Sequence, residues 1–160
     1  MNDATQMKDL AEPQGGFAQL VGYRLTKWES DYAEVELDLL PKHLNRSGVP
    51  HGGLIATLID TTGGFVGCYC AVPGRVRRAV TLNMSTNFLG QAGAGDRLTC
   101  KARRVGGGRT IFFAHCDLVD GKGQLIATGE GVYKYRKGSE DPNGVPLESP
   151  SPPERARGSK

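Results

Sequence analysis

One stretch of the sequence combines residue types that could act on a carbonyl group. His51-Gly52-Gly53 opens a run with helical spacing, and Asp60 follows eight residues after Gly52. The first N–H groups of a helix lack intrahelical partners and lie at the positive end of its dipole, and glycine lets a ligand approach them closely. Such groups can stabilise a carbonyl oxygen as it becomes an oxyanion. We therefore expect an oxyanion site at this helix start.

Asp60 is a carboxylate on a helix whose other residues are almost all apolar or small. A buried charge without partners is costly, so a helix that served packing alone would avoid it. Asp60 therefore either binds a neighbouring hydroxyl, such as that of Thr57 or Thr61, or faces a functional site.

The spacing of Gly52 and Asp60 predicts an assembly as well as a site. Eight helical residues span about 12 Å, whereas a base or nucleophile and the oxyanion donors must lie within about 3 Å of the atoms on which they act. One helix therefore cannot offer both groups to one carbonyl. Two antiparallel copies across a twofold axis could, because each Asp60 would approach the other chain's Gly52. We predict an obligate homodimer with two equivalent sites at its interface.

The elements around this segment predict an α+β domain with one antiparallel sheet. Apolar residues recur at intervals of three and four over residues 52–69, which indicates a helix, and its thin polar side indicates burial. Two strand-like runs precede the helix and four follow it, at residues 17–27, 32–39, 76–88, 97–105, 110–119 and 124–136. Short Gly-rich stretches join the last three runs as hairpins, so those strands are antiparallel neighbours. One apolar helix can cover one face of such a sheet.

Both chain ends differ in composition from this domain. The first dozen residues are mostly polar, and the C-terminal region is rich in Pro, Ser and charge. Such segments bury too little apolar surface to offset the entropy of ordering them. We predict a flexible segment at residues 1–15, one folded domain at 16–137 and a disordered tail at 138–160.

Composition argues against several classes of partner. A net charge of +3 is too small to indicate nucleic acid binding. No apolar run approaches the roughly 20 residues of a membrane-spanning helix, and no secretory signal is visible, so we expect a cytoplasmic protein without a membrane partner. The four cysteines form no metal-binding pattern.

These residues resemble the PaaI-type hotdog thioesterases, which hydrolyse acyl-CoA. The matching features are Asn45, then His51-Gly52-Gly53 six residues later, then Asp60, then the strand at 79–88 that leads to Gly95-Asp96. The resemblance covers about residues 16–136. It implies a hotdog fold, in which a curled antiparallel sheet wraps around one long central helix. It also implies a dimer that pairs again into a homotetramer, with no metal and no redox cofactor.

The resemblance implies a role for each matching residue. Asp60 is expected to act as general base or nucleophile, and the Gly52 N–H is expected to polarise the thioester carbonyl. Asn45 and His51 would position that carbonyl, and Thr81 would help to hold the attacking water. Structural alternatives exist for the last three, namely a turn former at Asn45, a residue bound to backbone at His51 and a plain strand residue at Thr81.

Other residues are expected to bind the substrate. The acyl group, medium-chain or aryl-acetyl, would lie between the two central helices of the dimer, where small residues leave space. CoA carries phosphates, which arginine can bind with paired hydrogen bonds. The predicted substrate contacts are Gly53, Ile59, Gly63, Gly64, Phe65, Arg77, Arg78 and Arg109.

Two other functions are compatible with parts of this pattern. A hotdog enoyl-CoA hydratase or dehydratase pairs a histidine with a carboxylate, as His51 and Asp60 could, but the longer hydratase signature is absent. A non-catalytic acyl-CoA-binding regulator would keep the pocket and need no carboxylate. The absence of a helix-turn-helix segment argues against the regulator.

Overall fold

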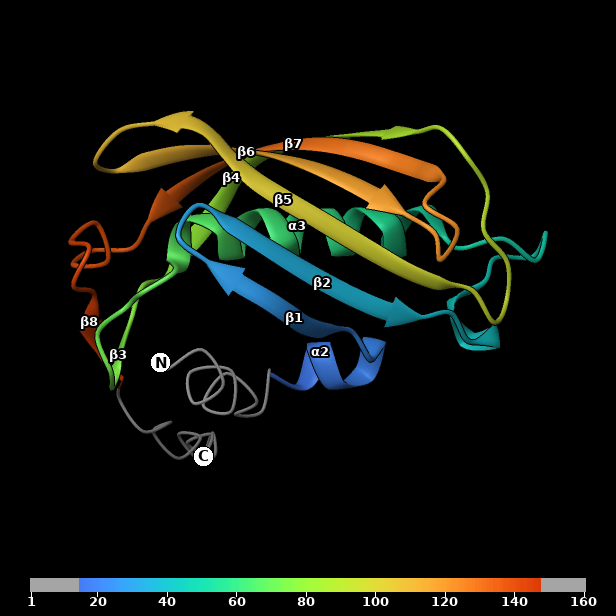
Figure 1. Cartoon of the computed structure of the whole chain (residues 1–160), viewed down its shortest axis with the longest axis horizontal. Coiled ribbons are helices and arrows are strands. Elements are labelled where there is room, and N and C mark those ends of the chain that lie inside the picture. The colour runs from blue at the N-terminus through green and yellow to red at the C-terminus, as the bar shows by residue number, and fades with distance from the viewer. Residues whose placement is uncertain (1–14, 148–160) are drawn as a thin grey trace, which may run out of the picture.

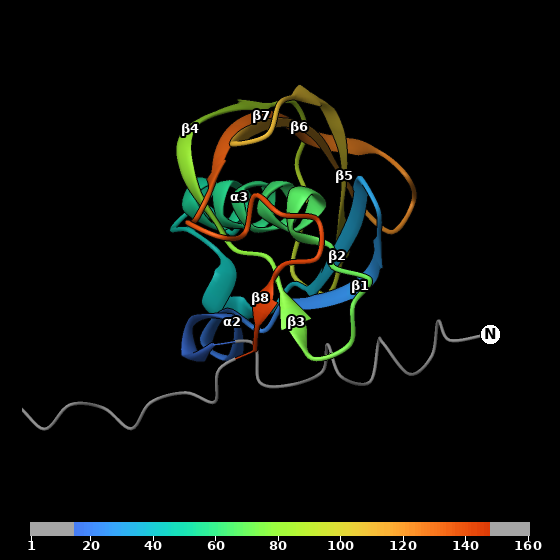
Figure 2. The ribbon, with the colours of Figure 1, turned by 90° about the vertical axis from the view of Figure 1, so that its left-hand side faces the viewer.

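A six-stranded antiparallel sheet curls around one long helix in the computed structural model, which describes residues 15–147 (Figure 1). The strand order in the sheet is β1-β2-β5-β6-β7-β4. The elements are α2 (Gly16–Val21), β1 (Arg24–Glu29), β2 (Tyr32–Asp38), the 3₁₀ turn η1 (Pro41–His43), α3 (Gly52–Cys68), β3 (Arg75–Val76), β4 (Ala79–Phe88), β5 (Arg97–Gly107), β6 (Ile111–Val119), β7 (Leu125–Tyr135) and β8 (Val145–Pro146). Figure 2 shows the sheet arched over α3. The predicted hotdog arrangement is confirmed.

Helix α3 is fixed at both ends by side chains. His51 is the N-cap, and its Nδ1 accepts a hydrogen bond from the Gly53 N–H at 2.9 Å. Near the other end, the Phe65 carbonyl accepts from Trp28 Nε1 and the Gly67 carbonyl accepts from the Tyr135 hydroxyl, each at 2.8 Å. Carbonyls in the last turn of a helix lack intrahelical partners, so these two donors stabilise the helix end.

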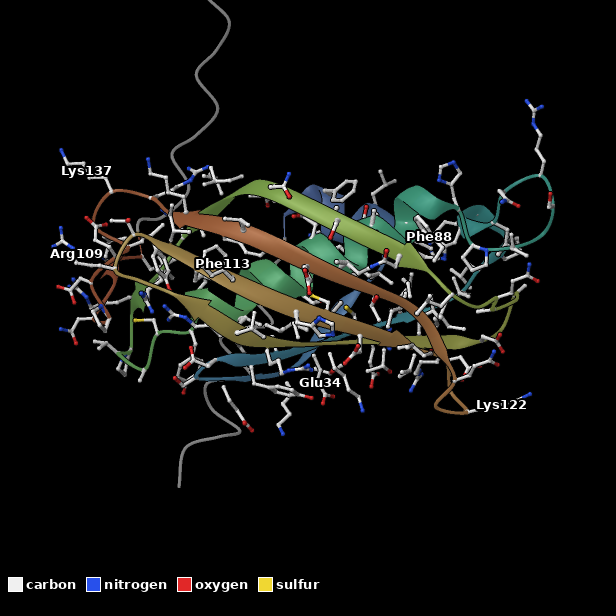
Figure 3. All side chains as sticks on the ribbon, turned by 90° about the horizontal axis from the view of Figure 1, so that it is seen from above. Glu34, Phe88, Arg109, Phe113, Lys122 and Lys137 are labelled. Atoms are coloured by element: carbon white, nitrogen blue, oxygen red, sulfur yellow. The ribbon has the colours of Figure 1, made fainter. Side chains whose placement is uncertain are left out.

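The sheet and the helix share one core. Along β2, buried side chains alternate with half-exposed ones such as Glu34, which Figure 3 labels. The buried face of α3 has helical periodicity and consists of Ile55, Leu58, Ile59, Thr62, Gly63, Val66, Gly67 and Cys68. The opposite side of the helix, which includes Asp60, is half-exposed. No helix of residues 15–147 is long and apolar enough to span a membrane.

The first predicted strand, at residues 17–27, is wrong in its first half. Gly16–Val21 form the short helix α2, and β1 begins only at Arg24. Ala18 is buried and Val21 packs against the core, whereas Phe17 and Leu20 are exposed. An inward spacing of three residues suits one helical turn better than a strand. Gly22, at φ 92°, ends the helix in a left-handed conformation that glycine adopts without strain.

The predicted boundary of the C-terminal tail is also wrong, because residues 138–147 are folded. Strand β8 pairs with β3, and Ser139 is buried. Arg75 holds this segment through Nε to the Asn143 carbonyl at 2.7 Å and Nη2 to the Gly144 carbonyl at 2.6 Å. Main-chain hydrogen bonds therefore order a segment that has little apolar surface. The remainder of the predicted tail, and residues 1–14 of the predicted flexible segment, lie outside the described residues.

Candidate active site

Asp60 is hydrogen-bonded from the neighbouring strand β4. Thr81 Oγ1 donates to Asp60 Oδ1 at 2.7 Å. The helix hydroxyl of Thr57 is engaged elsewhere, with the Gly53 carbonyl at 2.8 Å. The carboxylate is therefore held across the interface of helix and sheet, with its second oxygen Oδ2 left to face other groups.

An open cavity of about 360 Å³ is lined by Thr81, the residue that binds Asp60. We call it the cavity near Asp60. Its walls combine aromatic and small side chains with three arginines, and the lining residues are Trp28, Thr61, Gly64, Phe65, Cys68, Arg77, Arg78, Ala79, Thr81, Tyr133 and Arg136. Trp28 packs edge-on against Phe65 with ring centroids 5.5 Å apart. Burial raises the pKa of the Cys68 thiol to about 11. The thiol is therefore protonated at neutral pH and is a poor nucleophile.

Two of the predicted acyl-pocket residues belong to the core instead. Ile59 is fully buried and faces the sheet, where a Cβ at Gly129 would come within 2.4 Å of it. Gly63 faces the Tyr133 ring rather than open space. Ile59 and Gly63 are therefore packing positions, because a sheet strand fills the room that the sequence suggested was free. Gly64 and Phe65 do line the cavity near Asp60.

The start of α3 forms a second, separate cavity. It has a volume of about 290 Å³ and is lined by Val49, Pro50, Gly52, Ile55, Phe88, Gly90, Gln91, Ala92 and Ile126. Within residues 15–147, the Gly52 N–H makes no hydrogen bond. The Gly53 N–H is taken by His51, and Gly53 does not line either of these two cavities, so its role as a substrate contact stays a prediction. Gly52 is therefore the donor at this helix start that remains available.

Asn45 and His51 both make the structural contacts that the sequence offered as alternatives, a turn at Asn45 and a bond to the backbone at His51. Asn45 Oδ1 accepts the Ser47 N–H at 2.8 Å and the Val49 N–H at 3.4 Å, which closes the turn before the helix. His51 caps the helix through Nδ1. These bonds occupy one polar atom of each side chain, and both residues lie at the Gly52 end of α3 rather than near Asp60.

Several arginines surround a third and larger cavity, of about 770 Å³, at the opposite end of the sheet from Phe88 (Figure 3). Arg77 lines this cavity and also the one near Asp60, and its Nε donates to the Ser139 carbonyl at 3.0 Å. Arg104 and Arg109 line it as well, together with Glu140 and Asp141. Of these three cavities, Arg78 lines the one near Asp60.

The structure adds residues that sequence reasoning missed. Trp28 and Tyr133 lie far from Asp60 in the sequence, on β1 and β7, and only the strand order brings both to its cavity. Arg136 joins the predicted arginines in the same way. No local pattern in the sequence could have identified them. The described residues contain no group of three or more His, Cys, Asp or Glu side chains placed to hold a metal ion.

Comparison with known proteins identifies the family. The family model of the thioesterase superfamily matches residues 47–127, which include both ends of the segment from Gly52 to Asp60. The chain belongs to the thioesterase superfamily. This thioesterase is 33% identical to a putative esterase of Pseudomonas aeruginosa, over 62% of this chain and 72% of that protein. It is 32% identical to mouse acyl-coenzyme A thioesterase 13, over 59% of this chain and 66% of that protein.

Solved structures agree with this assignment. The thioesterase resembles the Streptococcus mutans protein smu.793, crystallised with acetyl CoA, with a TM-score of 0.63 and 29% identity over 71% of this chain and 88% of that chain. It shares its fold with the Escherichia coli PaaI protein, with a TM-score of 0.71 and 22% identity over 84% of this chain and 94% of that chain. The predicted resemblance to PaaI-type hotdog thioesterases is confirmed, and the protein is a thioester hydrolase.

Proposed function

We propose that the protein hydrolyses acyl-CoA to a free acid and CoA, with Asp60 as the group that activates water. The observation that carries this proposal is a carboxylate on a largely apolar helix, held by Thr81 beside an open cavity. The relatives support CoA as the thiol part of the substrate, because acyl-coenzyme A thioesterase 13 and smu.793, which was crystallised with acetyl CoA, are similar in sequence to this chain. A thioester carbonyl is less stabilised by resonance than an ester carbonyl, and thiolate is a good leaving group. One carboxylate and one oxyanion donor can therefore suffice.

The proposed reaction needs one proton acceptor and one oxyanion donor. Asp60 takes a proton from water, and the hydroxide forms a C–O bond with the thioester carbon. The carbonyl oxygen becomes an oxyanion that accepts a hydrogen bond from the Gly52 N–H at the positive end of α3. The intermediate then expels CoA thiolate as the C–S bond breaks, and the thiolate takes the proton from Asp60. In the alternative route Asp60 attacks directly, and only that route leaves an acyl adduct on Asp60, which mass spectrometry of quenched enzyme would detect.

We propose that the two groups come from two chains. Gly52 and Asp60 lie on one continuous helix, about 12 Å apart along its axis. Strand β4 forms an edge of the sheet, with Thr81 near its start and Phe88 at its end. Phe88 touches the Gly52 position, since a Cβ there would lie 3.5 Å from its ring. Antiparallel pairing of two β4 strands would thus bring the Asp60 end of one chain to the Gly52 end of its partner.

The cavity near Asp60 is the proposed site of the acyl group. Trp28 and Phe65 together supply an aromatic wall, and Gly64 adds a lining position without a side chain, which suits a medium-chain or aryl-acetyl group. Arg77, Arg78 and Arg109 are the proposed contacts of the CoA phosphates. Arg77 supports this assignment best, because it lies between the cavity near Asp60 and the larger arginine-lined cavity.

Release of CoA thiol from a panel of acyl-CoAs tests the proposed function. Asp60→Asn removes the proton acceptor and keeps the shape, so kcat should fall by about 100-fold or more. Asp117→Asn, on the outer face of the sheet, is the control and should match wild type. A second arm uses acyl-pantetheine, which lacks the nucleotide phosphates: Arg77→Ala should raise KM for acyl-CoA and not for acyl-pantetheine. Wild-type turnover in Asp60→Asn would contradict the proposal.

A further inference from the structure

Tyr133 occupies a slot that two glycines leave open beside the turn of α3 that carries Asp60. The ring lies on β7 and is 1% exposed. A Cβ at Gly63 would lie 2.2 Å from its hydroxyl oxygen, and a Cβ at Gly131 would lie 2.4 Å from it. Gly63 is inside the helix, where glycine is otherwise unfavourable. A glycine at this position lowers the stability of the helix but leaves the space that the Tyr133 hydroxyl occupies.

The hydroxyl of Tyr133 binds the main chain of Asp60 itself. It donates to the Asp60 carbonyl oxygen at 3.3 Å. Within the helix that carbonyl already faces the N–H of Gly64, four residues on, so the fold does not need a second donor there. Burial above all, together with the neighbouring Cys116 and Asp60, raises the pKa of Tyr133. The hydroxyl therefore keeps its proton and remains a donor at neutral pH.

Tyr133 and Thr81 form one rung of the sheet. They are directly paired residues on the adjacent strands β7 and β4. Thr81 binds the Asp60 carboxylate at 2.7 Å, and Tyr133 binds the Asp60 carbonyl. A single cross-strand pair thus contacts the side chain and the main chain of the same residue.

We propose that Thr81 and Tyr133 act together as a clamp on Asp60, and that Tyr133 is a positioning residue for hydrolysis. The clamp ties one helical turn to the sheet and so fixes where the carboxylate lies relative to the cavity near Asp60. Catalytic groups must be held to within a fraction of an ångström of their productive geometry. The inference rests on the proposed function, because it assumes that Asp60 activates water.

The same strand supplies a matched control. Tyr135 is also buried on β7, and its hydroxyl also donates to a carbonyl of α3, that of Gly67 at 2.8 Å. That carbonyl lies in the last helical turn, where it has no intrahelical partner. Tyr135→Phe and Tyr133→Phe therefore each remove one buried hydroxyl bond from strand to helix, but only the second removes it from the turn with Asp60.

Steady-state kinetics on the best acyl-CoA substrate of the wild-type protein tests the clamp. Tyr133→Phe should lower kcat about 10-fold and leave KM within about twofold, because geometry and not binding is impaired. Tyr135→Phe should keep kcat within about twofold of wild type, although thermal unfolding should show the larger loss of stability for this variant, because it leaves the Gly67 carbonyl without a partner. Unchanged kcat in Tyr133→Phe, or an equal fall in both variants, would overturn the positioning role.

Two further variants separate the possible causes of failure. In an Asp60→Asn background, Tyr133→Phe should cause no additional fall, because the residues act as one unit; a full additional fall would contradict the clamp. If Tyr133→Phe does not fold, Gly63→Ala replaces it, since its Cβ displaces the hydroxyl, and kcat should again fall with KM preserved. Wild-type turnover in Asp60→Asn would remove the proposed function and the clamp together, whereas an inactive Asp60→Asn beside a normal Tyr133→Phe would remove only the clamp.

Discussion

The two edges of the sheet differ in chemistry. Edge strand β1 presents charged side chains and ion pairs, such as Lys27 with Glu29 at 3.2 Å and Arg24 with Asp38 at 3.3 Å. Edge strand β4 instead exposes Val80, Leu82 and Phe88, with Leu82 52% and Phe88 58% exposed. Charges on an edge strand prevent pairing with another chain, whereas an exposed apolar edge favours it.

This contrast indicates which edge of the sheet is suited to remain in solvent and which is suited to pair with another chain. The charged β1 edge has the chemistry of a surface that remains in water. The β4 edge carries Thr81, which binds Asp60, and Phe88, which lies at the Gly52 end of α3. The groups proposed for catalysis therefore lie along the apolar edge, and a second chain there would cover apolar surface and complete the site at once.

A charge in the middle of the apolar edge should have the largest effect. Leu82→Asp is expected to separate the proposed dimer into monomers and to lower turnover about 100-fold, because an unpaired carboxylate would have to be buried between the chains. Light scattering on a sizing column measures the mass, and thiol release measures turnover. A dimer with full activity would break the proposed difference between the edges.

The same change at the charged edge supplies the comparison. Lys27→Asp reverses a surface charge on β1 and removes an exposed ion pair with Glu29 and a contact between the ammonium and the Tyr32 ring. Mass and turnover should both match wild type, since exposed ion pairs contribute little. A monomeric or inactive Lys27→Asp protein would mean that β1 is also an interface.

A small, pH-dependent effect on stability is expected at the charged side of the sheet. A hydrogen bond from Arg97 lowers the pKa of Asp38, so the ionised carboxylate is favoured in the folded state. Its contribution should be present above the unfolded pKa of about 4 and should disappear as the pH falls through the lowered folded pKa. Asp38→Asn should therefore lower Tm by about 2 °C at pH 7 and leave it unchanged in strong acid. Thermal unfolding at both pH values measures this, and an equal shift at both would contradict it.

Local patterns in the sequence predicted the framework of the site. The period of the apolar residues predicted α3 nearly to its last residue, because a helix buried on one face imposes that period. The alternation in β2 and the Gly-rich turns between β5, β6 and β7 predicted antiparallel neighbours in the same way. The family pattern also led to Thr81, which the structure joins to Asp60.

Contacts between distant segments could not be predicted. Arg75 orders the segment around Asn143 through main-chain carbonyls, which have no signature in composition. Gly63 suggested free space, yet Tyr133 of β7 fills it, because strand order decides which side chain meets the helix. Such contacts between distant segments produce no repeating pattern in the sequence of either segment, so they cannot be predicted from the sequence.

Complementation between two inactive variants tests most directly whether one site uses two chains. Gly52→Pro removes the proposed oxyanion donor, and proline is accepted at the first position of a helix. Asp60→Asn removes the proton acceptor. Each variant alone should be nearly inactive, but in a heterodimer one of the two sites combines an intact Gly52 with an intact Asp60.

The two variants are unfolded, mixed in equal amounts and refolded together. Random pairing makes half of the dimers heterodimers with one intact site each, so the mixture should recover about a quarter of wild-type activity per chain. Mass spectrometry of the native dimers verifies that mixing has occurred. Verified heterodimers with no recovered activity would contradict a site built from Gly52 of one chain and Asp60 of the other.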